Sequence, residues 1–148
     1  MGYCDAFHCD HCGYYETILY EIGMLFPQTY KNVLSAIKAG DYGEGMKKVS
    51  TEIPGIAVDA EWYLYICPGC GTWKNDYGLT LYEPNDPAHE GKNCVMLYDI
   101  QNNYHMKKRY IHKCTSCGKR MHRYKEGDQP ICPKCHHIGR IEPEGLWD

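Results

Sequence analysis

The sequence predicts an α+β protein whose short strands and helices are organised around clustered cysteines. Three observations support this class: ten cysteines in 148 residues, one amphipathic helical stripe, and several tyrosine-rich segments with the composition of strands. The length fits one ordinary domain or two small ones. With 43% hydrophobic and 24% charged residues, the chain has the composition of neither a disordered segment nor a membrane-spanning protein.

The cysteine spacing is the strongest signal. Two residues between thiols let both sulfurs of a tight turn face one ion, and two such turns supply the four ligands of a tetrahedral site. Glycine follows the second thiol in three pairs, where a left-handed backbone would lift amide protons toward the sulfurs; His136 and His137 follow the fourth. Eight cysteines form four such Cys-x-x-Cys pairs: Cys9/Cys12, Cys67/Cys70, Cys114/Cys117 and Cys132/Cys135.

Two other interpretations of paired cysteines are weaker. Disulfides suit a secreted scaffold, but the amino end shows no secretion signal. A thioredoxin-type redox turn needs a single Cys-x-x-Cys, whereas every pair here has similar partners. Paired cysteines without a secretion signal favour metal binding in a cytoplasmic protein. The apolar runs are too short for a spanning helix, so we expect no membrane association.

Distance along the chain predicts which pairs share an ion. Only 14 residues separate the third and fourth pairs, which is the length of a compact metal-binding hairpin. By elimination, the first two pairs share the other ion across 54 residues. The expected ligands are Cys9, Cys12, Cys67 and Cys70 at one site, and Cys114, Cys117, Cys132 and Cys135 at the other.

The segments Cys67-Pro-Gly-Cys-Gly71 and Cys132-Pro-Lys-Cys135 resemble the knuckles of zinc ribbons and of the rubredoxin-like fold. A split first ribbon and a compact second one is similar to small uncharacterised bacterial zinc-ribbon proteins. The resemblance implies two zinc ribbons, built as rubredoxin-like β-hairpins, with two Zn²⁺ ions. Rubredoxins hold iron in the same Cys4 knuckles and transfer electrons, so iron at one or both sites is an alternative that thiolate geometry does not exclude.

We expect a helical element to interrupt the first ribbon. An apolar stripe over residues 29–39, ended by Gly40, predicts one helix, and residues 44–52 predict a second. Both fall in an insertion of about residues 14–56, within a first domain of residues 1–100. Residues 101–148 are expected to form a compact basic ribbon with an acidic C-terminal tail.

Aromatic and β-branched runs predict the strands. They cover residues 62–66, 77–82 and 94–98, the last with Cys94 as a small buried hydrophobe. Residues 14–22 fit a strand and a helix equally well. Cys4 is expected to be a spare thiol near a filled site, and His8 and His11 to lie around the site rather than in it.

Charge is concentrated late in the chain. Residues 1–100 carry net −8, residues 101–140 net +8, and the last eight residues net −3. If residues 104–113 form a strand, one face is mainly cationic. The segment, interleaved with tyrosines, predicts nucleic-acid contact through Lys107, Lys108, Arg109, Lys113, Lys119, Arg120 and Arg123.

No catalytic motif is recognisable. The sequence lacks the zinc-protease, deaminase, phosphate-loop and nucleophile-elbow patterns, and no small-molecule substrate is indicated. A filled Cys4 site leaves no position for a metal-bound water. We therefore expect a non-enzymatic module with structural zinc that contacts nucleic acid; the alternatives are a protein-protein interaction adaptor and an iron electron carrier.

Overall fold

The computed structural model describes residues 2–89 and 93–148, which form a mixed α/β fold. The chain divides into two units made of discontinuous segments. We call them the cysteine unit (Met1–Gly23, Trp62–Asp76 and Ile111–Asp148) and the helical unit (Met24–Glu61 and Tyr77–Tyr110). The predicted division at residue 100 is wrong, because the chain crosses between the units at four points.

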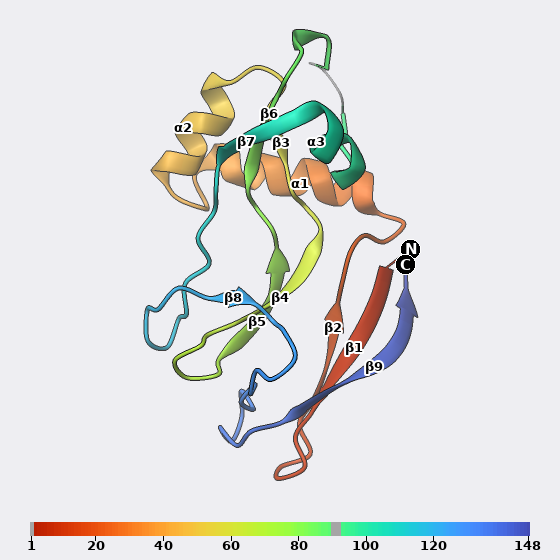
Figure 1. Cartoon of the computed structure of the whole chain (residues 1–148), viewed down its shortest axis with the longest axis vertical. Helices are drawn as coiled ribbons and strands as arrows, with labels where there is room; N and C mark the ends of the chain where they lie inside the picture. The colour runs from red at the N-terminus through yellow and green to blue at the C-terminus, as the bar shows by residue number, and fades with distance from the viewer. Residues whose placement is uncertain (1, 90–92) are drawn as a thin grey trace. The chain divides into compact units, whose positions relative to one another are not determined.

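The first sheet of the cysteine unit joins both ends of the chain. Its strands β1 (Gly2–His8), β2 (Tyr15–Leu19) and β9 (Arg140–Trp147) lie in the order β2-β1-β9, with antiparallel pairing. Gly2 lies opposite Trp147, so the two ends meet (Figure 1). The predicted acidic tail is therefore strand β9, and the ambiguous segment 14–22 contains a strand.

The second sheet of the cysteine unit has the order β5-β4-β8. Strand β4 (Trp62–Ile66) has the bounds predicted, β5 spans Trp73–Tyr77, and β8 spans His122–Arg123. Phe7 and Ile18 from the first sheet pack with Leu64, Ile66 and Trp73 of the second in one buried cluster. The two sheets of this unit thus share a core.

Two predicted helices are confirmed in the helical unit. Helix α1 spans Phe26–Ala39, and its buried residues Tyr30, Val33 and Ile37 belong to the predicted apolar stripe. It ends at Gly40, whose φ of 95° lets the chain turn back and donate to the carbonyl groups of the last turn. Helix α2 spans Glu44–Glu52, as expected, and packs against α1.

A third sheet, β3-β6-β7, completes the helical unit with helix α3 (Leu97–Asn103). Its strands are β3 (Ala57–Val58), β6 (Leu81–Pro84) and β7 (Tyr104–Lys108); a short 3-10 helix, η1, covers Pro87–His89. Helix α1 contacts β3, and α3 contacts β6 and β7 (Figure 1). The unit is therefore built from both of its chain segments, because β3 from the first pairs with β6 from the second.

Three predictions for this region are wrong. The strand over 77–82 divides between β5 and β6, because Leu79 takes a left-handed conformation with φ of 68°. Residues 94–98 lead into helix α3 (Leu97–Asn103) instead of forming a strand, and Cys94 is half-buried outside any strand. The insertion of residues 14–56 also differs, since the helical unit begins at Met24 and takes up Tyr77–Tyr110 as well.

Candidate metal centres

Eight cysteines gather in two groups of four within the cysteine unit. In each group the sulfur atoms all lie within 4.8 Å of one another. All ten cysteines of the chain are free thiols. We call the groups cluster 1 (Cys9, Cys12, Cys132 and Cys135) and cluster 2 (Cys67, Cys70, Cys114 and Cys117).

Cluster 1 is assembled by the pairing of β1 with β9. The register places His8, at the end of β1, opposite Arg140, at the start of β9. Cys9 follows His8 directly, and the Cys132–Cys135 turn shortly precedes Arg140. The pairing therefore brings together thiols that are 120 positions apart in the chain, Cys12 and Cys132.

Cluster 2 is assembled in the same way by β4 and β8. Ile66 lies opposite His122, so Cys67, the next residue after Ile66, meets the turn that precedes β8. An isolated bridge between Lys113 and Arg120 closes that turn around Cys114 and Cys117. Cys70 and Cys114, which face each other, are 44 positions apart.

The predicted pairing of the turns is therefore wrong. The expected sets combined Cys9/Cys12 with Cys67/Cys70, and Cys114/Cys117 with Cys132/Cys135, whereas the structure nests the second and third pairs inside the first and fourth. Short separation along the chain suggested the compact hairpin, but antiparallel strand pairing decides which turns meet. The structure does bring all eight predicted residues into groups of four.

The four Cys-x-x-Cys turns share one backbone geometry. In each, the residue directly after the second cysteine donates its N–H to the carbonyl of the first cysteine, at 2.9–3.0 Å. The N–H of the first cysteine donates to the carbonyl of the second residue after the second cysteine, at 2.8–2.9 Å. The donor residue is left-handed in every turn, with φ between 64° and 78°, as the glycines predicted. These residues are Gly13, Gly71, Gly118 and His136.

Sulfur–sulfur distances match coordination rather than disulfide bonding. In cluster 1, Cys9 lies 3.5 Å from Cys135 and Cys12 lies 3.6 Å from Cys132. The corresponding distances in cluster 2 are 3.4 and 3.6 Å. A disulfide requires about 2.05 Å, whereas four sulfurs at about 2.3 Å from one zinc ion are about 3.8 Å apart. These sulfur–sulfur distances are thus close to the edge length of a ZnS4 tetrahedron.

The first cysteine of each turn is buried and the second is more exposed. Cys9, Cys67, Cys114 and Cys132 are each at most 3% exposed. Their partners Cys12, Cys70 and Cys135 are half-buried, and Cys117 is exposed. Cys9 and Cys132 belong to the core of Phe7 and Trp73, while Cys67 and Cys114 pack with Tyr65 and Met121. The clusters therefore take the place of part of an apolar core.

The surroundings favour ionisation of the buried first cysteine in two of the turns, Cys114 in cluster 2 and Cys132 in cluster 1. Burial raises the pKa of Cys114, but hydrogen bonds from the backbone of Cys117 and Ser116 and from neighbouring thiols outweigh it and lower the pKa to about 6. The same balance of burial against backbone N–H donors lowers the pKa of Cys132 to about 7.

The second cysteines of these two turns, Cys117 and Cys135, behave in the opposite way. A backbone hydrogen bond from Lys119 lowers the pKa of Cys117, but the neighbouring thiols and desolvation raise it to about 11. Corresponding contacts with Cys9, Cys12 and Cys132 outweigh the backbone bond at Cys135 and raise its pKa to about 12. Four thiolates this close repel one another, so full ionisation of either cluster requires a cation.

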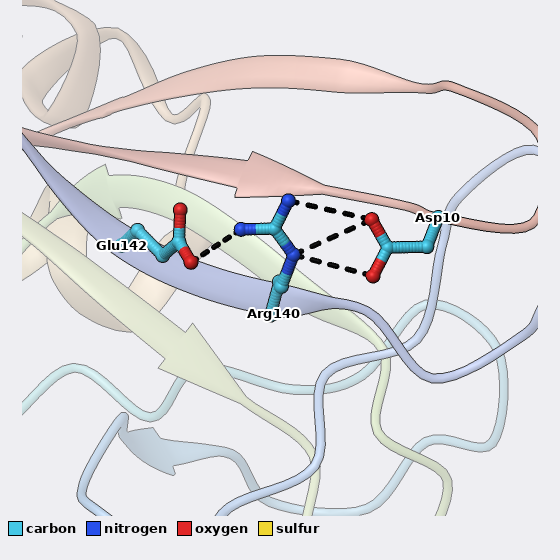
Figure 2. Close-up of polar contacts among 3 residues, drawn as sticks. All are labelled: Asp10, Arg140 and Glu142. Atoms are coloured by element: carbon cyan, nitrogen blue, oxygen red, sulfur yellow. Dashed lines mark hydrogen bonds and ion pairs between the residues drawn. The ribbon is translucent and has the colours of Figure 1, made fainter.

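An ion pair ties the first turn to strand β9. The Arg140 guanidinium contacts the Asp10 carboxylate at 3.2–3.4 Å and also pairs with Glu142 (Figure 2). Asp10 lies between Cys9 and Cys12, so the contact fixes one cysteine turn to the strand that follows the other. Arg140 and Asp10 are exposed, and the pair contributes little energy by itself.

The remaining candidate residues lie outside both clusters. The Cys4 thiol is buried in β1 and lies 4.0 Å from the Glu144 carboxylate. His8 packs edge-on against the Tyr15 ring. The His11 ring stacks on that of His137, beside Cys135. No sequence pattern indicated that contact beyond the presence of one histidine inside the first turn and another shortly after the fourth.

The predicted basic strip is divided between the units. Lys107, Lys108 and Arg109 belong to the helical unit, where Lys107 pairs with Glu83 at 3.3 Å. The other four belong to the cysteine unit, where the Arg123 guanidinium lies 3.8 Å from the centre of the Tyr63 ring. Strand β7 ends at Lys108, so residues 104–113 do not form the single strand that would have given one cationic face. The four residues of the basic strip that belong to the cysteine unit are Lys113, Lys119, Arg120 and Arg123.

Among the described residues, none of the helices combines the length and the apolar character that crossing a bilayer requires. Comparisons of the chain with protein-family models, with curated proteins and with solved structures found no match. The resemblance to zinc-ribbon proteins therefore stays a prediction.

Proposed function

We propose that this protein is a non-enzymatic binding module that two structural Zn²⁺ ions hold in its fold, one ion in each cluster. The observation that carries the proposal is the geometry of the sulfurs, which lie within 4.8 Å of one another in two closed groups. Four thiolates fill a tetrahedral zinc site and leave no position for a reacting water. The ions would act by joining distant segments of the chain.

Zinc content and absorption identify the metal. The purified protein is expected to be colourless and to contain two equivalents of zinc, because Zn²⁺ is d¹⁰ and has no visible absorption of its own. A red protein containing iron would instead support the electron-carrier alternative. Protein that folds fully without metal would contradict the proposal altogether.

Paired serine variants test the nested arrangement. Cys9→Ser with Cys132→Ser removes two ligands of cluster 1 and should leave one equivalent of zinc. Cys9→Ser with Cys67→Ser disrupts both clusters and should leave neither site complete. The pairing expected from chain distance predicts the reverse order of zinc contents. Cys94→Ser, in the helical unit, is the matched control and should keep two equivalents.

Nucleic acid is the partner we propose, on the evidence of cations around cluster 2. Lys113 and Arg120 form a bridge across the Cys114–Cys117 turn, and both are exposed. A side-chain carbon placed on Gly69 would lie 2.7 Å from Cδ of Lys119, so this lysine packs over the opposing turn. A Zn(Cys)4 centre has net charge −2, which the nearby cations exceed.

Salt-dependent binding to mixed oligonucleotides tests this partner. Phosphate contacts predict an affinity that falls steeply with ionic strength, and Lys113→Gln with Arg120→Gln should reduce that slope by about two. Lys107→Gln with Lys108→Gln is the control in the helical unit. Unchanged binding by the Lys113/Arg120 variant would contradict this surface, and a nuclease-resistant protein partner would favour the adaptor alternative.

A further inference from the structure

A third group of metal-ligating side chains lies on the surface beside cluster 1. It consists of His11, Cys135 and His137, whose ligand atoms all lie within 4.8 Å of one another. Both histidines are exposed, and their rings stack with centroids 3.6 Å apart and an interplanar angle of 12°. Cys135 is half-buried and also belongs to cluster 1.

The strand pairing that builds cluster 1 also brings these histidines together. His11 lies inside the first cysteine turn, and His137 follows the fourth. The carbonyl of His137 accepts a hydrogen bond from Cys132 N–H at 2.8 Å, which holds its backbone against the turn. The contact of Asp10 with Arg140 holds the neighbouring backbone of His11 to β9 (Figure 2).

We propose that His11, His137 and Cys135 form a third, exposed metal position that takes a borderline divalent cation such as Zn²⁺, Co²⁺ or Ni²⁺. Neutral imidazole and thiolate are the ligands these ions prefer. The inference rests on the proposed occupancy of cluster 1, because the Cys135 sulfur would then bridge two ions. A thiolate sulfur bound to one cation keeps lone pairs with which it can bind another.

The position differs from the two clusters in ways that set its properties. Three protein ligands leave at least one place for water, which is the pattern of an open site. The stacked rings must tilt apart so that both nitrogens face one ion, and exposure of both side chains leaves room for this. We therefore expect binding weaker than in the clusters and exchange with ions in solution.

Cobalt titration of the protein that already holds two zinc ions tests the site. Zinc binds thiolate sites more tightly than cobalt, so Co²⁺ should leave both clusters filled. The wild type should bind one equivalent of Co²⁺, with visible d–d absorption and a thiolate-to-cobalt charge-transfer band. His11→Gln with His137→Gln should weaken that binding at least about 100-fold and keep two zinc ions.

The control variant is His8→Gln with His105→Gln. His8 packs on Tyr15 and His105 contacts Asn85 and Glu83, so neither belongs to the group, and cobalt binding should be unchanged. Equal cobalt binding by the His11/His137 variant and the wild type would overturn the inference. So would d–d bands without a charge-transfer band, because Cys135 would then not be a ligand. A wild type that holds fewer than two zinc ions would overturn the proposed function and, with it, the shared thiolate.

Discussion

The two units bury different kinds of side chain. The core of the cysteine unit includes the buried thiols Cys9, Cys67, Cys114 and Cys132. The helical unit buries ordinary apolar residues, among them Tyr30, Ile37, Val58, Leu79 and Leu81, all at most 2% exposed. Its one cysteine, Cys94, is in neither cluster. If the clusters hold zinc as we propose, one unit depends on metal for its core and the other on hydrophobic burial.

The two clusters of the cysteine unit close chain loops of different length. Cluster 1 joins Cys12 to Cys132 across 120 positions, and cluster 2 joins Cys70 to Cys114 across 44. Closing the longer loop costs about 0.9 kcal/mol more, on a logarithmic dependence on loop length. Zinc bound by four thiolates would contribute about 10–16 kcal/mol whichever two turns meet, so it does not favour one pairing of the turns over the other. The pairing of β1 with β9 and of β4 with β8 is what brings these turns together.

Metal removal is the strongest test of the comparison. A strong chelator should unfold the cysteine unit, because each ion contributes binding energy of about 10–16 kcal/mol to its fold. The helical unit should keep its helices. All three tryptophans, Trp62, Trp73 and Trp147, lie in the cysteine unit, and α1, α2 and α3 lie in the helical unit. Tryptophan fluorescence and circular dichroism at the helix band therefore report the two units separately.

Chelation should change the tryptophan fluorescence and leave the helical circular dichroism largely unchanged, and added zinc should restore the fluorescence. Tryptophan emission should shift to that of solvent-exposed indole, while most of the helical ellipticity remains. Loss of both signals together would contradict the division into a metal-dependent and a metal-independent core. Hydrogen exchange would locate the change, with protection lost in β1, β4 and β9 and retained in α1.

Core truncation in each unit sharpens the comparison at a smaller energy. Ile37 is 0% exposed in α1, and Ile37→Ala should destabilise the helical unit by about 2–5 kcal/mol. Zinc content should stay at two equivalents. The matched variant is Ile66→Ala, at a position 1% exposed in β4. Urea titration is followed by circular dichroism at the helix band and by tryptophan fluorescence. Ile37→Ala should lower the midpoint of the helical signal, and Ile66→Ala should lower the midpoint of the tryptophan signal. A shift of both midpoints in either variant would mean that the units unfold together.

The sequence could predict local structure where the chemistry is local. The apolar stripe of α1 and the bounds of α2 and β4 follow from patterns within a few residues. The left-handed turns follow from glycine after the second thiol. Residues 94–98 show the limit, because a short apolar run is compatible with a strand and with the start of a helix. In the structure α3 begins at Leu97, so only the last two residues of this run are helical.

The arrangement of the clusters could not be predicted in the same way. Four cysteine turns are similar to one another, so nothing local says which two should meet. The decision is made by β1 with β9, strands at opposite ends of the chain, and by β4 with β8. Neither β8, with two residues, nor the mostly exposed β9 shows strong alternation in its burial. Long-range pairing of weakly patterned strands is thus what sequence reasoning missed.

Alanine at two glycines separates backbone strain from packing within cluster 2. Gly71 and Gly118 both have a left-handed backbone, with φ of 78° and 74°. Strain alone should cost about 1–2 kcal/mol for Gly118→Ala, since nothing lies within 4 Å of the added carbon. In Gly71→Ala that carbon would lie 2.5 Å from the carbonyl oxygen of Gln129, so the loss should be larger. Zinc affinity and the tryptophan midpoint in urea measure both variants. Equal losses of stability in the two variants would mean that the backbone at Gln129 moves away from the added carbon at no cost.

The fourth turn offers the converse change, with the smallest expected effect. His136 has the same left-handed conformation as the three glycines, with φ of 64°. His136→Gly should relieve strain of about 1–2 kcal/mol, offset by about 0.5–1 kcal/mol because glycine gains freedom in the unfolded chain. The cysteine unit should therefore become slightly more stable, by about 0.5–1 kcal/mol, while the helical unit is unaffected. Lys134→Gly, in the same turn without a positive φ, keeps the N–H that faces the Cys132 sulfur at 3.4 Å and should only lose stability. The tryptophan midpoint in urea measures both variants, and a loss for His136→Gly equal to that for Lys134→Gly would show that the histidine side chain stabilises the turn by more than its backbone strain.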